Sequence, residues 1–271
     1  QDIDGGTYCM NYQRNADVDA VMAVHALGHS CDLGSIVTDS FIERSIPILG
    51  DAAQAFDTKY NGKRVGALAD ISILSFQETK MLTLCGEGGA VLTNRDDLAD
   101  RVRHLMNHGE YYSNSSSVGG NFRATEIGAA YGIVQMLKID KIMNELWEGW
   151  NYVIDHLPSC LVPPFTASYC ERSPYIMPCT YRDSSMSRDE FVKQVNERRD
   201  KILWKSDSDI PGANNKPGRG FVSAGYSKML IDIPAYSHEG VSSLYFPKAK
   251  EAMESWVWCD LHRWRPNGLE D

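Results

Sequence analysis

The chain has 271 residues and a mass of 30.3 kDa, with 43% apolar and 23% charged residues. These values are ordinary for a globular protein and leave room for one large α/β domain, alone or with a smaller one. A net charge of −9 and a pI near 5.3 argue against nucleic-acid binding, and the absence of a long apolar run argues against a membrane span.

Short apolar runs predict strands in the first part of the chain. Strand candidates lie within Val18–Gly28, within 45–55 (ending at Asp51), within 68–76 and within 88–94, and residues 32–44 could hold a helical crossover. The runs lack a strict polar–apolar alternation, which is typical of a sheet buried on both faces. The pattern therefore predicts an α/β domain with a mostly parallel sheet.

Two helices are predicted before Pro158. The first covers residues 97–104. The second begins after a loop at 107–122, with Thr125 as its N-cap, and helical character continues to Pro158. In the second helix, apolar side chains recur every three or four residues, at Ile127, Ala130, Tyr131, Val134 and Leu137. This spacing predicts one buried stripe.

The sequence pattern changes after Pro163. We therefore predict a large domain over 1–158 and a small α+β domain over 159–271. A strand is expected at 173–183, and a helix at 187–198 begins with a capping box of Ser187 and Glu190. Residues 205–240 are rich in Gly, Pro, Asn and Ser and read as loop, followed by a helix and a strand over 245–261. The tryptophans Trp256, Trp258 and Trp264 are expected to pack this domain.

Neither cysteines nor histidines indicate a metal site. The seven cysteines form no CxxC pair, so a zinc knuckle or redox dithiol is not expected, and reduced thiols favour a cytoplasmic protein. The scattered histidines, His25, His29, His108 and His238, have no metal-ligand spacing and are expected to be structural. The polar first residues are unlike a signal peptide.

Polar residues follow two of the predicted strands, at the edge where open α/β sheets bind their ligands. Asp51 and Gln54 follow one strand; Ser75 and Lys80 follow the next, just before Gly86, Gly88 and Gly89. Taken singly, these residues are typical of a turn or cap aspartate, a satisfied hydroxyl and a surface lysine, and the glycines are typical of a turn.

Taken together, the four residues match the needs of pyridoxal phosphate. A lysine can form a Schiff base with its carbonyl, and a carboxylate keeps its pyridine nitrogen protonated. The phosphate and the phenolic oxygen need hydroxyl and other polar donors. Lys80, Asp51, Ser75 and Gln54 supply one group of each kind.

These residues also carry a resemblance. The stretch "ILGDAAQAF…ISILSFQETKMLTLCGEGGAVLTN" is similar to the core of the DegT/DnrJ/EryC1/StrS aminotransferases, in which an acidic residue with "AAQ" is followed by "SF", a lysine and "G(D/E)GG". "DID" at Asp2–Asp4, "VMAVHALG", "LMNHGE" and "GGNFRATEIGAAYG" also resemble family segments. The resemblance is strong from residue 2 to about 142 and implies the fold-type I pyridoxal-phosphate (PLP) fold.

The resemblance implies a role for each site residue. Lys80 would bind the cofactor as an internal aldimine and shuttle a proton; Asp51 would pair with the pyridine nitrogen, Gln54 with the phenolic oxygen and Ser75 with the phosphate. Asn121 matches an asparagine that reaches the neighbouring subunit's phosphate site, which implies a homodimer with shared active sites.

The implied activity is transfer of an amino group from glutamate or glutamine to a nucleotide-linked keto-sugar or a keto-cyclitol, and "SFQETKMLTLCGEGG" leans toward aminocyclitol members. The presence of Lys80 disfavours the sugar-dehydratase branch. Family members carry several dozen residues before "DID", including a phosphate-binding loop and a ring-stacking aromatic residue that this chain lacks. A truncated chain could instead be a non-catalytic binding or regulatory protein, and this alternative stays open.

Overall fold

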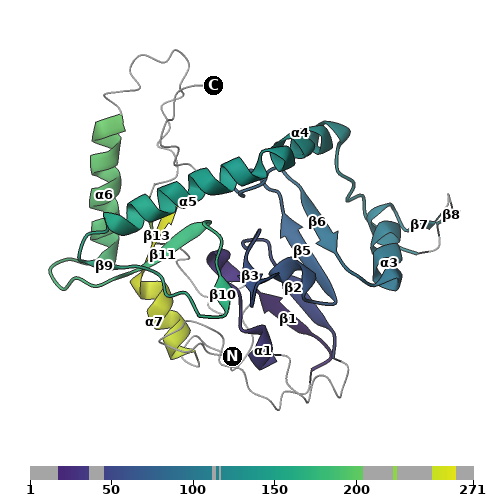
Figure 1. The fold of residues 1–271 in the computed structure, drawn as a ribbon, viewed down its shortest axis with the longest axis horizontal. Helices are drawn as coiled ribbons and strands as arrows, with labels where there is room; N and C mark the ends of the chain where they lie inside the picture. The colour runs from purple at the N-terminus through teal and green to yellow at the C-terminus, as the bar shows by residue number, and fades with distance from the viewer. Residues whose placement is uncertain are drawn as a thin grey trace. The chain divides into compact units, whose positions relative to one another are not determined.

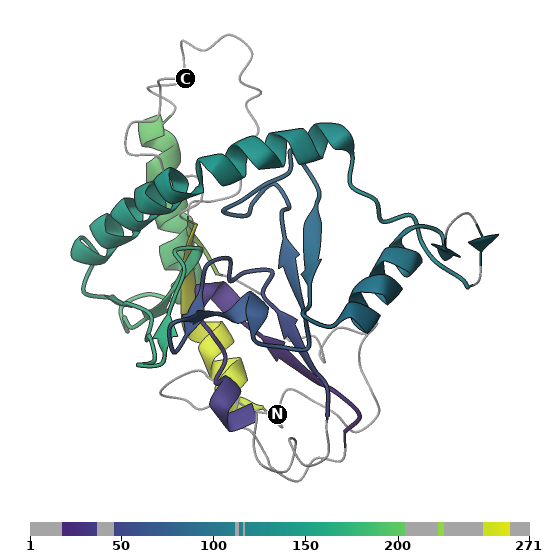
Figure 2. The ribbon, with the colours of Figure 1, turned by 45° about the vertical axis from the view of Figure 1, so that its right-hand side comes forward.

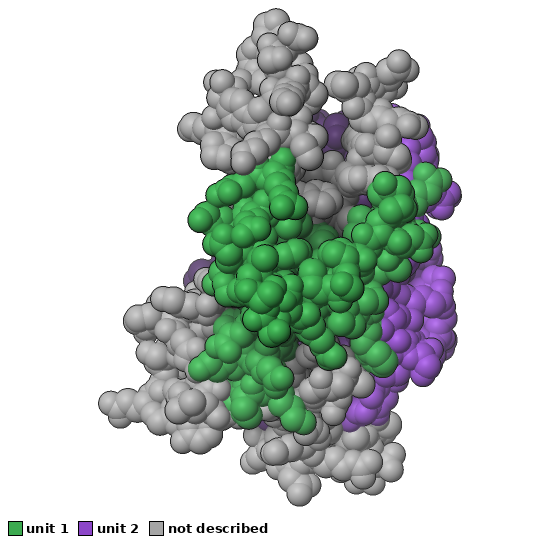
Figure 3. Space-filling model, turned by 90° about the vertical axis from the view of Figure 1, so that its left-hand side faces the viewer, with its two compact units in different colours: residues 1–11, 148–165, 176–271 green, residues 12–147, 166–175 purple. Residues whose placement is uncertain are grey.

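A computed structural model describes residues 18–36, 46–111, 114–115, 117–203, 222–224 and 246–260. The described residues form two compact units, shown in Figure 3. Of the described residues, unit 2 holds those from 18 to 147 together with 166–175, and unit 1 holds 148–165 and those from 176 onward. The predicted Asp2–Asp4 strand and most of the 32–44 crossover lie outside the described residues.

A four-stranded sheet organises unit 2 (Figures 1 and 2). Its strands, in spatial order, are β1 (Val21–Val24), β2 (Ile48–Asp51), β5 (Ile71–Ser75) and β6 (Gly89–Leu92). The first three run parallel and β6 is antiparallel to β5. The structure thus confirms the four strand predictions and the mostly parallel α/β class.

The expectation that this sheet is buried on both faces is wrong for the described residues. Val24, Asp51, Ile73 and Val91 are paired in register across the four strands and so share one face. Val24 is 50% exposed, Ile73 44% and Val91 43%. Apolar content alone does not distinguish a face that is covered from one that is merely apolar.

The helices of unit 2 begin with α1 (Leu33–Ile36), which realises a small part of the predicted crossover. The predicted helix at 97–104 is confirmed as α3 (Asp96–Met106). The second prediction is confirmed as α4 (Glu126–Leu137) and α5 (Ile139–Asp155); α5 runs on into unit 1. Thr125 is the N-cap as predicted, because its hydroxyl accepts a hydrogen bond from the Gly128 N–H at 3.1 Å.

The predicted buried stripe of α4 is wrong. Ile127 is 81% exposed and Leu137 82% exposed, while the buried positions of the helix are Gly128 and Gly132. A Cβ added at Gly132 would lie 2.0 Å from the Leu84 side chain, so Leu84 occupies the space that the missing side chain leaves. The helix therefore turns its glycines inward and its apolar stripe outward.

Residues 166–175 return to unit 2 and add a strand to a second, small sheet. β10 (Cys170–Glu171) pairs with β3 (Lys59–Tyr60), which pairs with β4 (Lys63–Arg64). The Ala167 N–H also donates to His29 Nε2 at 3.0 Å. A separate hairpin joins β7 (Glu110–Tyr111) to β8 (Asn114–Ser115).

Unit 1 has a four-stranded antiparallel sheet with α6 (Arg188–Leu203) and α7 (Pro247–Ser255). Its strands, in spatial order, are β12 (Val222–Ser223), β13 (Trp256–Asp260), β11 (Ile176–Tyr181) and β9 (Leu161–Val162). Met177, Cys179 and Val257 are fully buried at its centre. The strand prediction at 173–183 and the final helix and strand are confirmed, and β13 contains Trp256 and Trp258.

Two local predictions in unit 1 need correction. Only half of the capping box forms: Ser187 Oγ accepts from the Glu190 N–H, but the Glu190 carboxylate accepts from Gln194 instead of returning to Ser187. The predicted loop over 205–240 contains β12, because the Asn196 amide and the edge of β13 supply hydrogen-bond partners for Val222. A strand of two residues is too short to leave a sequence pattern.

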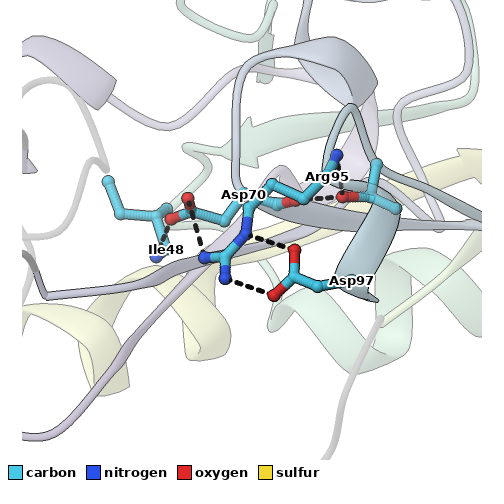
Figure 4. Close-up of polar contacts among 5 residues, drawn as sticks. Ile48, Asp70, Arg95 and Asp97 are labelled. Atoms are coloured by element: carbon cyan, nitrogen blue, oxygen red, sulfur yellow. Dashed lines mark hydrogen bonds and ion pairs between the residues drawn. The ribbon is translucent and has the colours of Figure 1, made fainter. Parts of the chain in front are cut away.

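A polar cluster joins the amino ends of β2 and β5 to the start of α3 (Figure 4). Asp70 accepts from the Ile48 N–H at 2.8 Å, and Arg95 makes two hydrogen bonds to Asp97, at 2.6 and 3.1 Å. The hydrogen bond from Arg95 lowers the pKa of the Asp97 carboxyl. The cluster lies at the sheet edge opposite the predicted site, and its groups are satisfied by one another, so it is structural.

No helix in the described part of the chain combines the length and the apolar character needed to cross a membrane.

Candidate active site

The carboxyl ends of β2 and β5 carry the predicted residues of the site. Asp51 is the last residue of β2 and Ser75 the last residue of β5, on neighbouring parallel strands. Parallel strands present their carboxyl ends at one edge, where open α/β sheets bind ligands. The structure therefore brings Asp51 and Ser75 to the same edge of the sheet.

Lys80 lies in a closed loop that leaves this edge. The Phe76 N–H donates to the Gly88 carbonyl at 2.8 Å, and the Leu84 N–H donates to the Phe76 carbonyl at 2.9 Å, so both ends of the loop are tied together. Within it, the Lys80 N–H donates to the Gln77 carbonyl at 2.9 Å. Two of the glycines that follow Lys80 suit this return into β6: Gly86 has a φ of 127°, and a Cβ at Gly89 would lie 2.8 Å from the Leu74 carbonyl oxygen.

The same loop is seated on α4. A Cβ at Gly128 would lie 3.1 Å from the Leu84 carbonyl oxygen, and one at Gly132 would overlap the Leu84 side chain. A larger residue at either position would push the loop away from the helix. The two inward glycines of α4 thus allow the loop that carries Lys80 to pack closely against this helix.

Gln54 is oriented by the turn that follows β1. The Leu27 N–H donates to Gln54 Oε1 at 2.9 Å. Leu27 has a φ of 53° and Gly28 a φ of 78°, so this turn visits the left-handed region twice. Because the amide oxygen is engaged by Leu27, the amide NH₂ is the part of Gln54 that remains to donate.

The groups left over at this edge suit the parts of pyridoxal phosphate. Asp51 Oδ1 accepts from the Ala53 N–H, and Ser75 Oγ accepts weakly from the Gln77 N–H. Among the described residues, no partner engages Asp51 Oδ2, the Gln54 NH₂ or the Ser75 hydroxyl hydrogen. One acceptor carboxylate oxygen and two sets of donors are what a protonated ring nitrogen, a phenolic oxygen and a phosphate require.

Lys80 has a partner that the sequence did not reveal. Its Nζ donates to the Tyr175 hydroxyl at 3.1 Å and lies 4.8 Å from the centre of the Tyr175 ring. Tyr175 is only 4% exposed. It follows Lys80 by 95 residues, and "SPY" carries no local pattern that would point to the lysine.

His25 is a second residue of the site region that sequence reasoning treated as structural. The His25 backbone N–H donates to the Asp51 carbonyl at 2.9 Å, and the ring Nδ1 of His25 accepts from the Cys31 N–H at 3.3 Å. Burial lowers the pKa of His25 from 6.5 to about 4, against the opposing effect of the Asp51 charge. The imidazole is therefore neutral at pH 7, with its hydrogen on Nε2.

Asn121 is placed apart from the other four residues. It forms an isolated bridge with Asn107, is exposed, and accepts a hydrogen bond from Arg123 Nε at 3.0 Å. No hydrogen bond in the described structure joins it to Asp51, Gln54, Ser75 or Lys80. It precedes the first residue of α4, Glu126, by five positions in the chain.

Comparison with known proteins decides the family. The sequence model of the DegT/DnrJ/EryC1/StrS aminotransferase family matches residues 2–203. The chain belongs to this family. The resemblance carried by the Asp51–Lys80 stretch is thereby confirmed.

Two relatives are named for nucleotide-linked amino sugars. GDP-perosamine synthase of Escherichia coli O157:H7 is 40% identical over 130 residues, which are 46% of this chain and 35% of that protein. The dTDP-3-amino-3,6-dideoxy-alpha-D-galactopyranose transaminase of Aneurinibacillus thermoaerophilus is 33% identical over 184 residues, 66% of this chain and 46% of the relative. The chain thus spans less than half the length of either protein.

Solved structures of aminotransferases share the fold. The aminotransferase TlmJ from Streptoalloteichus hindustanus matches all of this chain and 68% of its own, with a TM-score of 0.75 and 23% identity. The putative sugar aminotransferase Spr1654 from Streptococcus pneumoniae, in its PLP form, matches 100% of this chain and 70% of its own, with a TM-score of 0.75 and 20% identity. These likenesses confirm the predicted fold class.

Proposed function

We propose that the protein is a PLP-dependent aminotransferase that moves an amino group from an amino-acid donor to a nucleotide-linked keto-sugar. The observation that supports this most strongly is the placement of Lys80 beside the edge where Asp51, Gln54 and Ser75 each keep one unused polar group. The named relatives support a nucleotide-linked acceptor over the cyclitol to which the sequence leaned.

Each residue has a defined task in this proposal. Asp51 Oδ2 accepts the hydrogen of the ring nitrogen and keeps it protonated. The Gln54 NH₂ donates to the phenolic oxygen, and the Ser75 hydroxyl donates to the phosphate. When bound, pyridoxal phosphate supplies an electrophilic carbonyl carbon and a ring that accepts the electron pair released at the substrate carbon.

Lys80 is the nucleophile and the proton carrier of the proposed site. Its Nζ would hold the cofactor through the cofactor's carbonyl carbon, and as a free amine it would accept a proton from the substrate carbon and donate a proton back. The chain's own part in the chemistry is therefore to bind, to orient and to move one proton.

We further propose that the active unit is a homodimer. Four apolar side chains at three- and four-residue spacing on α4 are exposed, Ile127, Tyr131, Val134 and Leu137, and Asn121 precedes this helix in the chain. A second copy of this stripe would cover it and would bring Asn121 toward a neighbour's phosphate site. Exposed apolar stripes of this kind are typical of protein interfaces.

The test of the activity uses the full-length protein with pyridoxal phosphate, glutamate or glutamine, and GDP-, UDP- and dTDP-linked 4-keto and 3-keto sugars. We expect formation of an amino-sugar nucleotide together with the keto acid of the donor, and loss of both products in Lys80→Ala. Lys59→Ala changes another lysine of the same unit, paired to Glu171 at 2.7 Å, and serves as the control.

Two results would contradict the proposal. If the holo protein transfers no amino group to any of these acceptors, the non-catalytic alternative becomes the better account. If it releases ammonia and a deoxygenated sugar instead of an amino sugar, the protein is a dehydratase.

A further inference from the structure

The structure assigns a catalytic role to Tyr175: its hydroxyl and ring hold the Lys80 amine at the site whenever that amine is not bonded to the cofactor. This inference rests on the proposed aminotransferase function and names a further residue for it. The direct observations are the 3.1 Å hydrogen bond from Lys80 Nζ to the Tyr175 hydroxyl and the 4.8 Å distance from Nζ to the ring centre.

A tyrosine suits this task in both charge states of the lysine. The phenolic oxygen accepts a hydrogen bond from an ammonium group, and the phenolic O–H can donate to a neutral amine. The face of the ring attracts the ammonium form as well. Tyr175 can therefore keep the same contact while Lys80 gains and loses a proton, without changing its own charge.

The position of Tyr175 is built into unit 2 by a buried anchor. The Ser173 N–H donates to the Gly28 carbonyl at 2.9 Å, and the Thr58 hydroxyl lies 2.9 Å from both that carbonyl and Ser173 Oγ. Thr58, Ser173 and Pro174 are fully buried. The Tyr175 N–H then donates to the Ser173 carbonyl at 3.0 Å, which fixes the backbone, and the 4% exposure of the side chain shows that the ring is packed in place.

The course of the chain gives the same indication. Residues 148–165 belong to unit 1, residues 166–175 return to unit 2, and β11 resumes unit 1 at Ile176. Tyr175 is the last residue of this return, and its hydroxyl contacts Lys80. The segment 166–175 thus brings the Tyr175 side chain to the loop that carries Lys80, and both belong to unit 2.

The first test separates the hydroxyl from the ring. Tyr175→Phe keeps the ring and removes the hydrogen bond, and we expect kcat to fall by about 10- to 100-fold with little change in KM for the acceptor. Tyr60→Phe is the matched control: it removes a hydroxyl from the same unit that contacts Gly34 and Asp32 and not Lys80. We expect its kcat to stay close to wild type.

The second test needs no activity. In the cofactor-free protein, the ring face of Tyr175 should shift the NMR signals of the Lys80 ε-methylene group upfield through its ring current. Lys80→Arg assigns these signals. We expect Tyr175→Phe to keep the upfield shift, Tyr175→Leu to abolish it, and Tyr60→Phe to leave it unchanged.

The outcomes distinguish this inference from the proposed function. A wild-type enzyme that transfers amino groups, with Tyr175→Phe matching its kcat or losing no more than Tyr60→Phe, overturns the role of Tyr175 alone. An absent ring-current shift in the wild type overturns the contact itself. A wild type that binds the cofactor at Lys80 but transfers nothing overturns the proposed function, and the catalytic role of Tyr175 with it.

Discussion

At the scale of single residues, local hydrogen bonds decide which polar atom of each side chain can meet a ligand. Gln54 shows this most clearly. Its amide oxygen accepts from the Leu27 N–H at 2.9 Å, so its amide NH₂ is presented as a donor. The motif predicts that a glutamine is present, but the orientation of its side-chain amide is set by a backbone N–H group 27 residues away.

Gln54→Glu tests this direction with almost no change of shape. The carboxylate can still accept from Leu27, but it offers an acceptor where the NH₂ was a donor to the phenolic oxygen. We expect the affinity for pyridoxal phosphate to fall by about tenfold or more, with a small change in melting temperature. Equilibrium binding followed by absorbance measures the affinity; an unchanged dissociation constant would show that Gln54 does not face the phenolic oxygen.

His25 predicts a pH dependence of stability. Its pKa is lowered by burial from 6.5 to about 4, so between these values the unfolded chain binds a proton that the folded protein does not. The contribution of His25 to the free energy of unfolding should therefore be complete above pH 6.5 and should be lost as the pH drops toward 4. The loss should reach at most about 3 kcal/mol.

Urea unfolding between pH 4 and 8 measures this dependence, and His25→Asn is the matched variant. The asparagine can still accept from the Cys31 N–H but does not titrate. Its stability should be lower than that of the wild type at pH 7 and should fall less between pH 6.5 and 4. Parallel pH curves for the two proteins would refute the assignment to His25.

Sequence patterns predicted the site residues that lie close together in the chain, and the structure shows where the strands that carry two of them end. Asp51, Gln54, Ser75 and Lys80 fall within one stretch of strand, loop and glycine-rich turn, and both Asp51 and Ser75 end their strands as predicted. The roles of all four stay proposals that the experiments above address. Tyr175 could not be predicted, because its contact with Lys80 depends on the return of residues 166–175 to unit 2. This return leaves no periodic pattern in the sequence.

At the scale of elements, the turn Ala26–Gly28 connects several parts of the site. Leu27 orients Gln54, and Gly28 accepts the hydrogen bonds that anchor the segment of Tyr175. A Cβ at Gly28 would lie 2.3 Å from the Ser173 carbonyl oxygen, closer than real Cβ contacts come. Only glycine permits both the positive φ and this approach.

Gly28→Ala should therefore destabilise the protein by about 2–4 kcal/mol and lower kcat, because both backbone strain and a backbone clash oppose it. Gly62→Ala is a matched control: Gly62 has a φ of 76°, and nothing lies within 4 Å of its Cβ position. Strain alone should cost that variant about 1 kcal/mol and leave kcat intact. Equal losses of stability in thermal or urea unfolding would show that the Ser173 contact is unimportant.

The helix α4 shows what periodicity can and cannot predict. The three- and four-residue spacing of apolar side chains correctly indicated a helix, but the stripe faces outward and the glycines face the lysine loop. Hydrophobic spacing identifies an apolar face and says nothing of what covers it. For the same reason, the apolar strands did not reveal that the sheet face shared by Asp51, Val24, Ile73 and Val91 is partly exposed.

At the scale of the whole molecule, the outward stripe of α4 predicts a dimer that acidic substitution should weaken. Ile127→Glu places a charge within the proposed interface, at one of its most exposed apolar side chains, so we expect the dimer dissociation constant to rise by at least about tenfold. Val162→Glu, at an exposed apolar residue of unit 1, is the control. Light scattering over a range of concentrations measures the change; a monomeric wild type, or equal effects of the two variants, would contradict the proposed interface.

Asn121 gives the dimer a functional test. If each site takes Lys80 from one chain and Asn121 from the other, a mixture of Lys80→Ala and Asn121→Ala chains forms heterodimers with one intact site. Random mixing should restore activity to about one quarter of the wild-type level. Activity that never exceeds the average of the two separate variants would place Asn121 outside the neighbour's site.

The central claim is that Lys80 is the residue that attaches pyridoxal phosphate. The most direct measurement treats the full-length protein with the cofactor, fixes the linkage with borohydride, and locates the added mass by peptide mass spectrometry. We predict one pyridoxyl-phosphate group per chain on the peptide that contains Lys80, together with a violet-edge absorbance band that Lys80→Ala abolishes. Modification spread over surface lysines, or equal labelling of Lys80→Ala, would contradict the account.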